Sequence, residues 1–86
     1  MRSSPERPSS AKESAARIGQ FVRQRRIDNA MTQTELGELA GTGTRLISDL
    51  ERGKLTLRLD AVNAVLAAFG KMLGVVDTTR DSGGQP

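Results

Sequence analysis

The groups able to do chemistry in this sequence are its charged and hydroxyl side chains. The chain carries 10 arginines and 3 lysines against 10 carboxylates, for a net charge of +3, and it has no cysteine and no histidine. It therefore lacks the commonest general base, the commonest metal ligand and any thiolate. No nucleophile elbow, P-loop or dinucleotide fingerprint appears either. We expect no enzymatic activity, no cofactor and no metal site, and the mild basicity fits a polyanionic partner.

Residues 32–53, TQTELGELAGTGTRLISDLERG, predict two short helices joined by a tight turn. Thr32 and Glu35 have the spacing of a capping box, in which each side chain satisfies the other residue's backbone N–H. Gly41 and Gly43 interrupt the helical pattern, as glycine does where a turn needs positive φ. Helices this short are unstable alone and must pack against the rest of the chain. The residues expected to face inward are Leu36 and Leu39 in the first helix and Leu46, Ile47 and Leu50 in the second.

This pattern resembles the helix-turn-helix of phage repressors and of the wider Xre/Cro-like repressor family. The positions that carry the resemblance are Gln33, Gly37, Gly41, Ile47 and Glu51. Three residues depart from the family pattern: Gly37 stands for a usual Ala, Thr42 for a usual buried Val, and Gly43 for a usual Ser cap. Gly37 alone costs about 1 kcal/mol of helix propensity. The resemblance implies an all-α, four-helix, lambda-repressor-like domain of modest stability.

The resemblance also implies which residues touch DNA, because the second helix of the motif enters the major groove. Base contacts fall on Thr44, Arg45, Ser48 and Asp49. Phosphate contacts fall on Thr32, Gln33, Gly43, Arg52 and Lys54.

Several of these roles have alternatives. The guanidinium fork of Arg45 suits guanine O6 and N7, but it also suits a phosphate or a pair with Asp49 on the same helix. Thr44 suits a thymine methyl or a phosphate. Asp49 is able to accept from cytosine N4, or to orient Arg45 or Arg52.

An ion pair between Arg26 and Glu51 is a further implication of the resemblance. In the family, an arginine seven residues before the leading Gln pairs with the Glu at the end of the second helix. A bidentate pair of this kind ties the first helix of the domain to the third.

The flanking sequence completes the expected domain, which spans residues 10–70. Residues 1–9 are rich in proline, serine and charge, and we expect a disordered arm. Ser10 and Glu13 form a second possible capping box for a helix over 11–28. Asn29 then takes the left-handed conformation in this prediction, and Met31 packs as a hydrophobic staple.

A fourth helix is expected over 57–69, with Thr56 as its cap and Gly70 at its end. Its core face comprises Leu59, Val62, Val65, Leu66 and Phe69. Residues 71–77, KMLGVVD, predict a β-strand, and 78–86 a disordered tail.

A lone strand needs a ladder partner, and the favoured partner is the same strand of a second subunit. Its apolar side chains are Met72, Leu73, Val75 and Val76. The alternatives are pairing with a different protein, or an extended apolar tail lying on the core. The short strand and polar tail resemble the HipB-type antitoxins, which are dimeric repressors with an interchain β-lid.

The HipB resemblance implies binding to a palindromic operator in the protein's own promoter and to a HipA-type kinase toxin. Two other functions remain open: a stand-alone regulator without a toxin, and a protein-interaction module that no longer reads DNA. No apolar run approaches the length needed to span a bilayer, so a cytoplasmic location is expected.

Overall fold

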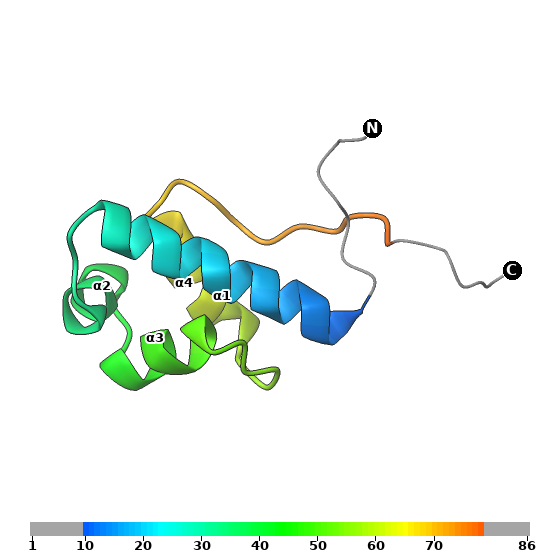
Figure 1. The fold of residues 1–86 in the computed structure, drawn as a ribbon, viewed down its shortest axis with the longest axis horizontal. Helices are drawn as coiled ribbons and strands as arrows, with labels where there is room; N and C mark the ends of the chain where they lie inside the picture. The colour runs from blue at the N-terminus through cyan, green and yellow to red at the C-terminus, as the bar shows by residue number, and fades with distance from the viewer. Residues whose placement is uncertain (1–9, 79–86) are drawn as a thin grey trace, which may run out of the picture.

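The computed structural model describes residues 10–78. They form four helices: α1 (Ala11–Asp28), α2 (Gln33–Ala40), α3 (Thr44–Glu51) and α4 (Leu59–Ala67). The long α1 crosses the middle of the molecule, with α2 and α3 on one side of it and α4 behind (Figure 1). The predicted all-α, four-helix fold is confirmed. The predicted arm at 1–9 and the tail from 79 onward lie outside the described residues.

A small apolar core holds the four helices together. Every helix contributes to it, through Val22 from α1, Leu36 from α2, Ile47 and Leu50 from α3, and Val62, Val65 and Leu66 from α4. Phe21 and Phe69 close one edge of the core in a T-shaped contact, with ring centroids 6.3 Å apart and planes at 85°. Burying these side chains supplies most of the stabilisation, because helices this short are marginal in isolation.

All four helices end in the same way. A backbone N–H reaches the carbonyl five residues earlier, as in Met31 to Arg26 at 3.0 Å and Lys54 to Asp49 at 3.0 Å. This Schellman arrangement requires a residue with positive φ just before the donor. The four residues that provide it are Ala30, Gly41, Gly53 and Gly70, with φ of 56°, 75°, 81° and 73°.

The end of α1 corrects one prediction. Asn29 has φ −97°, so it is not left-handed, and Ala30 takes that conformation instead. The geometry explains the shift, because the positive φ falls at the residue between the helix cap and Met31, whatever its type. An L-residue with a Cβ is strained there, so this turn stores a small local cost.

The start of α4 corrects a second prediction. The helix begins at Leu59, and its cap residue is Arg58, which makes no side-chain capping bond, so Thr56 is not the cap. Two leucines predicted to face the core are instead exposed: Leu39 at 63% and Leu59 at 71%. Both lie at helix ends, where helical spacing no longer decides which side of the chain is covered.

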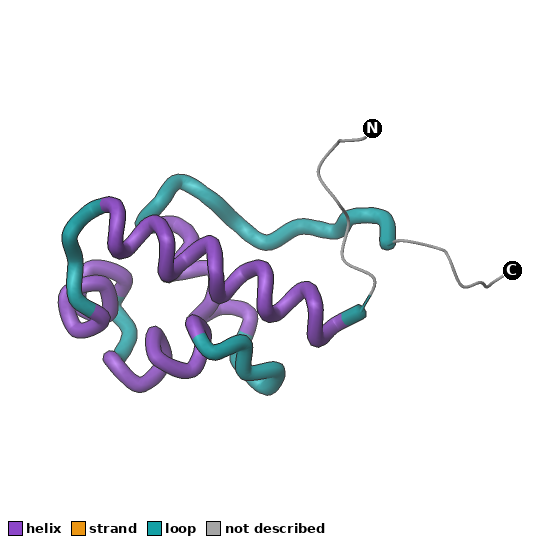
Figure 2. The backbone as a smooth tube through the Cα atoms, viewed as in Figure 1, coloured by secondary structure: helices purple, strands orange, loops and turns teal. Residues whose placement is uncertain are grey.

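Residues 71–78 form a loop that runs back along α1 (Figure 2). Leu73 anchors this loop: its N–H donates to Asn63 Oδ1 at 2.7 Å and its side chain packs against the core. Within residues 10–78 the single chain contains no strand. A strand that pairs only with a second subunit has no ladder partner in one chain, so the ribbon remains a prediction.

At Gly19 the backbone of α1 lies close to the backbone at the C-terminal end of α3. A Cβ built at this buried position would lie 2.4 Å from the carbonyl oxygen of Leu50. Only glycine fits such a distance, because the obstacle is backbone and not a flexible side chain. Gly19 therefore sets how deeply the C-terminal end of α3 sits against α1.

Candidate nucleic-acid interface

The turn between α2 and α3 is built from local signals in the sequence. Thr32 accepts from the Glu35 N–H at 3.0 Å, and Glu35 Oε1 accepts from the Thr32 N–H at 2.8 Å, so the predicted capping box is present. At the other end of α2, Gly41 takes the left-handed conformation and redirects the chain. Gly43 begins α3 without a side-chain capping bond.

Close packing explains why a glycine occupies position 37 despite its poor helix propensity. A Cβ at this buried position would lie 3.1 Å from both the carbonyl carbon of Gly43 and the carbonyl oxygen of Thr42. The turn therefore packs closely on α2, and alanine would have to push it outward. The Thr42 hydroxyl oxygen is buried beside this contact without a hydrogen-bond partner.

The helix α3 has one face in the core and one toward solvent. Ile47 and Leu50 are buried in the core, and Leu46 packs against it. Of the residues predicted to meet bases, Thr44 and Arg45 are exposed on the remaining surface, Ser48 is half-buried, and Asp49 is buried. The solvent face of α3 thus carries the polar groups of the motif.

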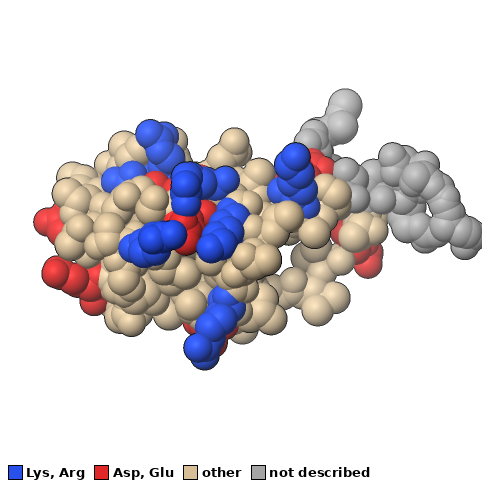
Figure 3. Space-filling view, turned by 90° about the horizontal axis from the view of Figure 1, so that it is seen from below, with Lys and Arg blue, Asp and Glu red and all other residues tan. Residues whose placement is uncertain are grey.

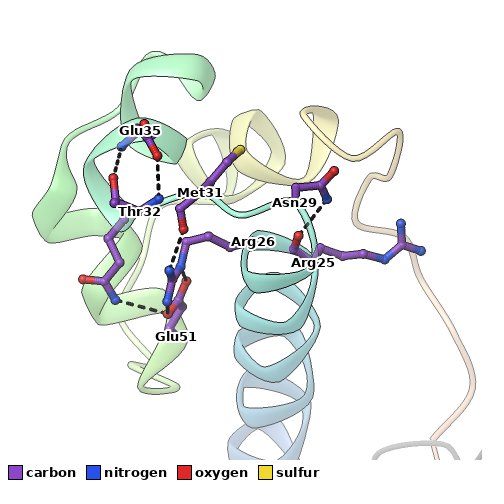
Figure 4. A network of polar contacts seen from close by, with 8 residues as sticks. Arg25, Arg26, Asn29, Met31, Thr32, Glu35 and Glu51 are labelled. Atoms are coloured by element: carbon purple, nitrogen blue, oxygen red, sulfur yellow. Dashed lines mark hydrogen bonds and ion pairs between the residues drawn. The ribbon is translucent and has the colours of Figure 1, made fainter.

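Glu51 ends α3 with its carboxylate turned into the protein (Figure 4). Arg26 donates to it through Nε at 2.7 Å and Nη2 at 3.1 Å, while Arg26 Nη1 donates to the Met31 carbonyl at 2.8 Å. The side chains of Arg26 and Glu51 are only 14% and 4% exposed. The hydrogen bond to Glu51 raises the pKa of Arg26 above its ordinary value. The pair links α1 to α3, as the family resemblance implied.

Gln33 adds a third element to this contact. Its Nε2 donates to Glu51 Oε1 at 3.1 Å, so the start of α2 is also tied to the end of α3. Thr32 uses its hydroxyl in the capping box, and Thr44 Oγ1 lies 3.1 Å from Thr34 Oγ1. Thr32, Gln33 and Thr44 were predicted to touch DNA, and without DNA their side chains make contacts within the motif.

Asp49 is the second buried carboxylate of α3. Its side chain is 6% exposed and lies within ion-pair distance of three cations: Arg52 Nη2, Arg45 Nε at 3.5 Å and Lys54 Nζ at 3.6 Å. The cation side chains are themselves 86% exposed for Arg45, 69% for Arg52 and 45% for Lys54. On the face of the molecule seen from below, basic side chains gather around an acidic centre (Figure 3).

The charge state of Asp49 follows from two opposing effects. Burial raises the pKa of its carboxyl, while the hydrogen bond from Arg52 and the charges of Lys54, Arg45 and Arg52 lower it. The net pKa lies below the ordinary aspartate value. The carboxylate is therefore ionised at neutral pH and carries one negative charge among three positive ones.

The structure brings together four of the predicted contact residues: Arg45, Asp49, Arg52 and Lys54 form one cluster on α3 and the turn after it. The spacing of Arg45, Asp49 and Arg52 was visible in the sequence, but the position of Lys54 was not. Lys54 folds back because its N–H closes the Schellman turn on the Asp49 carbonyl. Thr32, Gln33 and Gly43 lie outside this cluster, at the starts of α2 and α3.

Comparison with known proteins assigns this arrangement to a family. A family model described as a helix-turn-helix domain matches residues 17–82. The chain belongs to this helix-turn-helix family. It is also similar to y4mF of Sinorhizobium fredii (strain NBRC 101917 / NGR234), described as an uncharacterised HTH-type transcriptional regulator. The two are 39% identical over 61 residues, or 71% of this chain and 80% of the relative.

In this helix-turn-helix domain, α2 and α3 are the two helices of the motif and α3 occupies the place of the recognition helix. In residues 10–78 no three His, Cys, Asp or Glu side chains are placed to hold a metal ion. Among the helices of the same residues, none combines the length and the apolar character that a membrane span requires.

Proposed function

We propose that this protein is a sequence-specific DNA-binding transcriptional repressor that acts in the cytoplasm. The observation that carries the proposal is the cation cluster on α3. Arg45 on α3 and Arg52 and Lys54 in the turn after it are exposed, and the opposite side of α3 packs in the core. In this fold α3 is the helix that enters the major groove.

Arg45 is the residue assigned to base recognition. It lies in the first turn of α3, where recognition helices meet base edges, and its side chain is 86% exposed. Arg52 and Lys54, at the far end of the helix, are assigned to phosphates. Thr44 and Ser48 complete the base-facing surface, and Thr32, Gln33 and Gly43 are assigned to the adjacent backbone through the starts of α2 and α3.

Binding to the DNA upstream of the protein's own gene tests this function. Fluorescence anisotropy on labelled upstream fragments should show tighter binding than on shuffled duplexes of the same composition, measured at several salt concentrations. A footprint on the same fragment locates the operator. Equal affinity for both DNAs would reject sequence-specific repression and favour a protein-interaction module instead.

The finer proposal is a homodimer that binds a palindromic operator through paired copies of residues 71–77. Met72, Val75 and Val76 are 79%, 103% and 65% exposed in the single chain, and a strand ladder would cover them in part. A two-fold axis perpendicular to the strand makes the pairing antiparallel. It would set two recognition helices about 34 Å apart, one turn of DNA.

Charges placed in this segment test the dimer without touching the core. The double variant Val75→Asp, Val76→Asp should sediment as a monomer and lose most operator affinity, because the two half-sites no longer bind as one unit. Thr78→Asp, one residue beyond the segment, is the control and should remain dimeric. A dimeric double variant would place the interface in the helices.

The resemblance to HipB-type antitoxins adds a possible partner, a HipA-type kinase toxin. A kinase-fold open reading frame beside this gene, whose product co-purifies with the protein, would support the antitoxin role. Absence of such a neighbour would leave a stand-alone regulator.

A further inference from the structure

Asp49 differs from the other polar residues of α3 because it is buried beneath cations that are exposed. Its carboxylate is shared by Arg45, one helical turn earlier, by Arg52, three residues later, and by Lys54 beyond the helix end. A carboxylate in this place is too covered to reach a base edge without first releasing its cations.

We propose that Asp49 is a positioning residue that sets the DNA specificity of α3 by fixing the three cations and cancelling one of their charges. This inference rests on the proposed DNA-binding function. Because all three cations contact the Asp49 carboxylate, it orients Arg45 toward a base and Arg52 and Lys54 toward phosphates.

The first physical reason is conformational entropy. Arginine and lysine side chains are long and lose much of their rotamer freedom when they are ordered. In this protein all three cations already lie within ion-pair distance of the Asp49 carboxylate when no DNA is bound. Part of that ordering therefore precedes DNA binding. The Schellman turn contributes by holding the Lys54 backbone on the Asp49 carbonyl at 3.0 Å.

The second reason is the distribution of charge. Phosphate contacts supply sequence-independent affinity, whereas base contacts supply specificity. One negative charge among three positive ones reduces the net attraction of α3 to phosphates on any DNA. It leaves the hydrogen-bonding geometry of Arg45 intact, so operator and random DNA are affected unequally.

The test compares Asp49→Asn with Asp28→Asn in the full-length protein. Both variants remove one negative charge with little change of shape, but Asp28 is an exposed residue of α1 whose carboxylate accepts from Gln24 at 2.8 Å. Binding to an upstream operator fragment and to random duplex is measured across a range of salt. Asp49→Glu restores the charge and serves as the rescue variant, and circular dichroism melting verifies folding.

We expect Asp49→Asn to bind random DNA about three- to tenfold more tightly than Asp28→Asn does. Its plot of log K against log salt should be steeper by about one unit, the value for one additional phosphate contact. The ratio of operator to random affinity should fall at least tenfold, and Asp49→Glu should recover part of the ratio. If the wild type shows no operator preference, the proposed repressor function fails, but the random-DNA affinity and salt slope still decide whether Asp49 restrains the cations.

Two results would overturn the inference. Identical behaviour of Asp49→Asn and Asp28→Asn on both DNAs would show that Asp49 does not control the cations. A loss of operator affinity at a single base pair, with unchanged random binding and salt slope, would show that Asp49 itself contacts a base.

Discussion

Two carboxylates in the last turn of α3, Asp49 and Glu51, form ion pairs of different kinds. Glu51 and Asp49 are two residues apart, and their side chains are 4% and 6% exposed. The partner of Glu51 is Arg26, whose side chain is 14% exposed, whereas the partners of Asp49 are exposed by 45% or more. The two carboxylates are similarly covered, so the pairs differ in the exposure of their cations. We propose that the pair with the covered cation stabilises the fold and that the pairs with exposed cations act in DNA binding.

This difference follows from how each pair is desolvated. A buried charge left without its partner is expensive, because the low-dielectric interior solvates it poorly. Exposed cations keep their water, so losing their anion costs little stability and mainly changes what they attract. Substitutions at the two carboxylates should therefore separate folding from DNA binding.

Glu51→Ala should have the largest effect. It leaves the Arg26 guanidinium without its carboxylate partner and removes the acceptor of the Gln33 amide. The free energy of unfolding should therefore fall by about 3 kcal/mol. DNA affinity per folded molecule should stay near the wild-type value. Urea denaturation followed by circular dichroism measures the first quantity, and titration at a temperature where the variant is folded measures the second. An unchanged midpoint of unfolding would mean that the pair contributes nothing.

Gly19→Ala tests the same side of α3 without altering charge. The added Cβ would meet the Leu50 carbonyl oxygen at 2.4 Å, so α1 and α3 must separate. We expect a loss of about 2–3 kcal/mol, net of the better helix propensity of alanine. Gln20→Ala, at the exposed neighbouring position of α1, is the control and should change stability by less than about 0.5 kcal/mol. Equal stability of both variants would show that the close approach is easily relaxed.

Arg45→Ala should act on binding and leave folding intact. We expect operator affinity to fall by about 1–3 kcal/mol, with relaxed preference at one base pair in each half-site. Arg52→Ala should instead weaken operator and random DNA alike. Competition titrations against operators with single base-pair changes distinguish the two. Equal weakening by Arg45→Ala on all sequences would make Arg45 a phosphate ligand.

Local patterns made most of the fold predictable. The capping box of Thr32 and Glu35, the turn glycine Gly41 and the apolar spacing in α3 each act within a few residues, so the sequence shows them directly. Leu39 and Leu59 were assigned wrongly because each lies at a helix end, where burial depends on neighbours that spacing does not reveal.

The features that required the structure depend on contacts between helices. The need for glycine at Gly19 arises only from the approach of the Leu50 carbonyl, which no local pattern records. The role of Asp49 depends on how α3 is rotated against the core, because that rotation buries its carboxylate and exposes its cations. Sequence spacing suggested the pairing with Arg45 and Arg52, but it did not bring Lys54 to the same carboxylate.

Ala30→Gly should have the smallest effect of these variants, and it should stabilise the fold where the others destabilise it or weaken binding. Ala30 has φ 56° at the one helix end of the four that lacks glycine, and the turn it forms presents the Met31 carbonyl to Arg26. Relief of left-handed strain should raise the free energy of unfolding by about 1 kcal/mol, partly offset by the greater freedom of glycine in the unfolded chain.

The reciprocal control is Gly41→Ala, where a Cβ meets nothing within 4 Å. It should cost about 1 kcal/mol through φ alone. DNA affinity should stay constant in Ala30→Gly, because its turn lies on the Glu51 side of the motif. Altered affinity would show that the two carboxylate sites are coupled through α3.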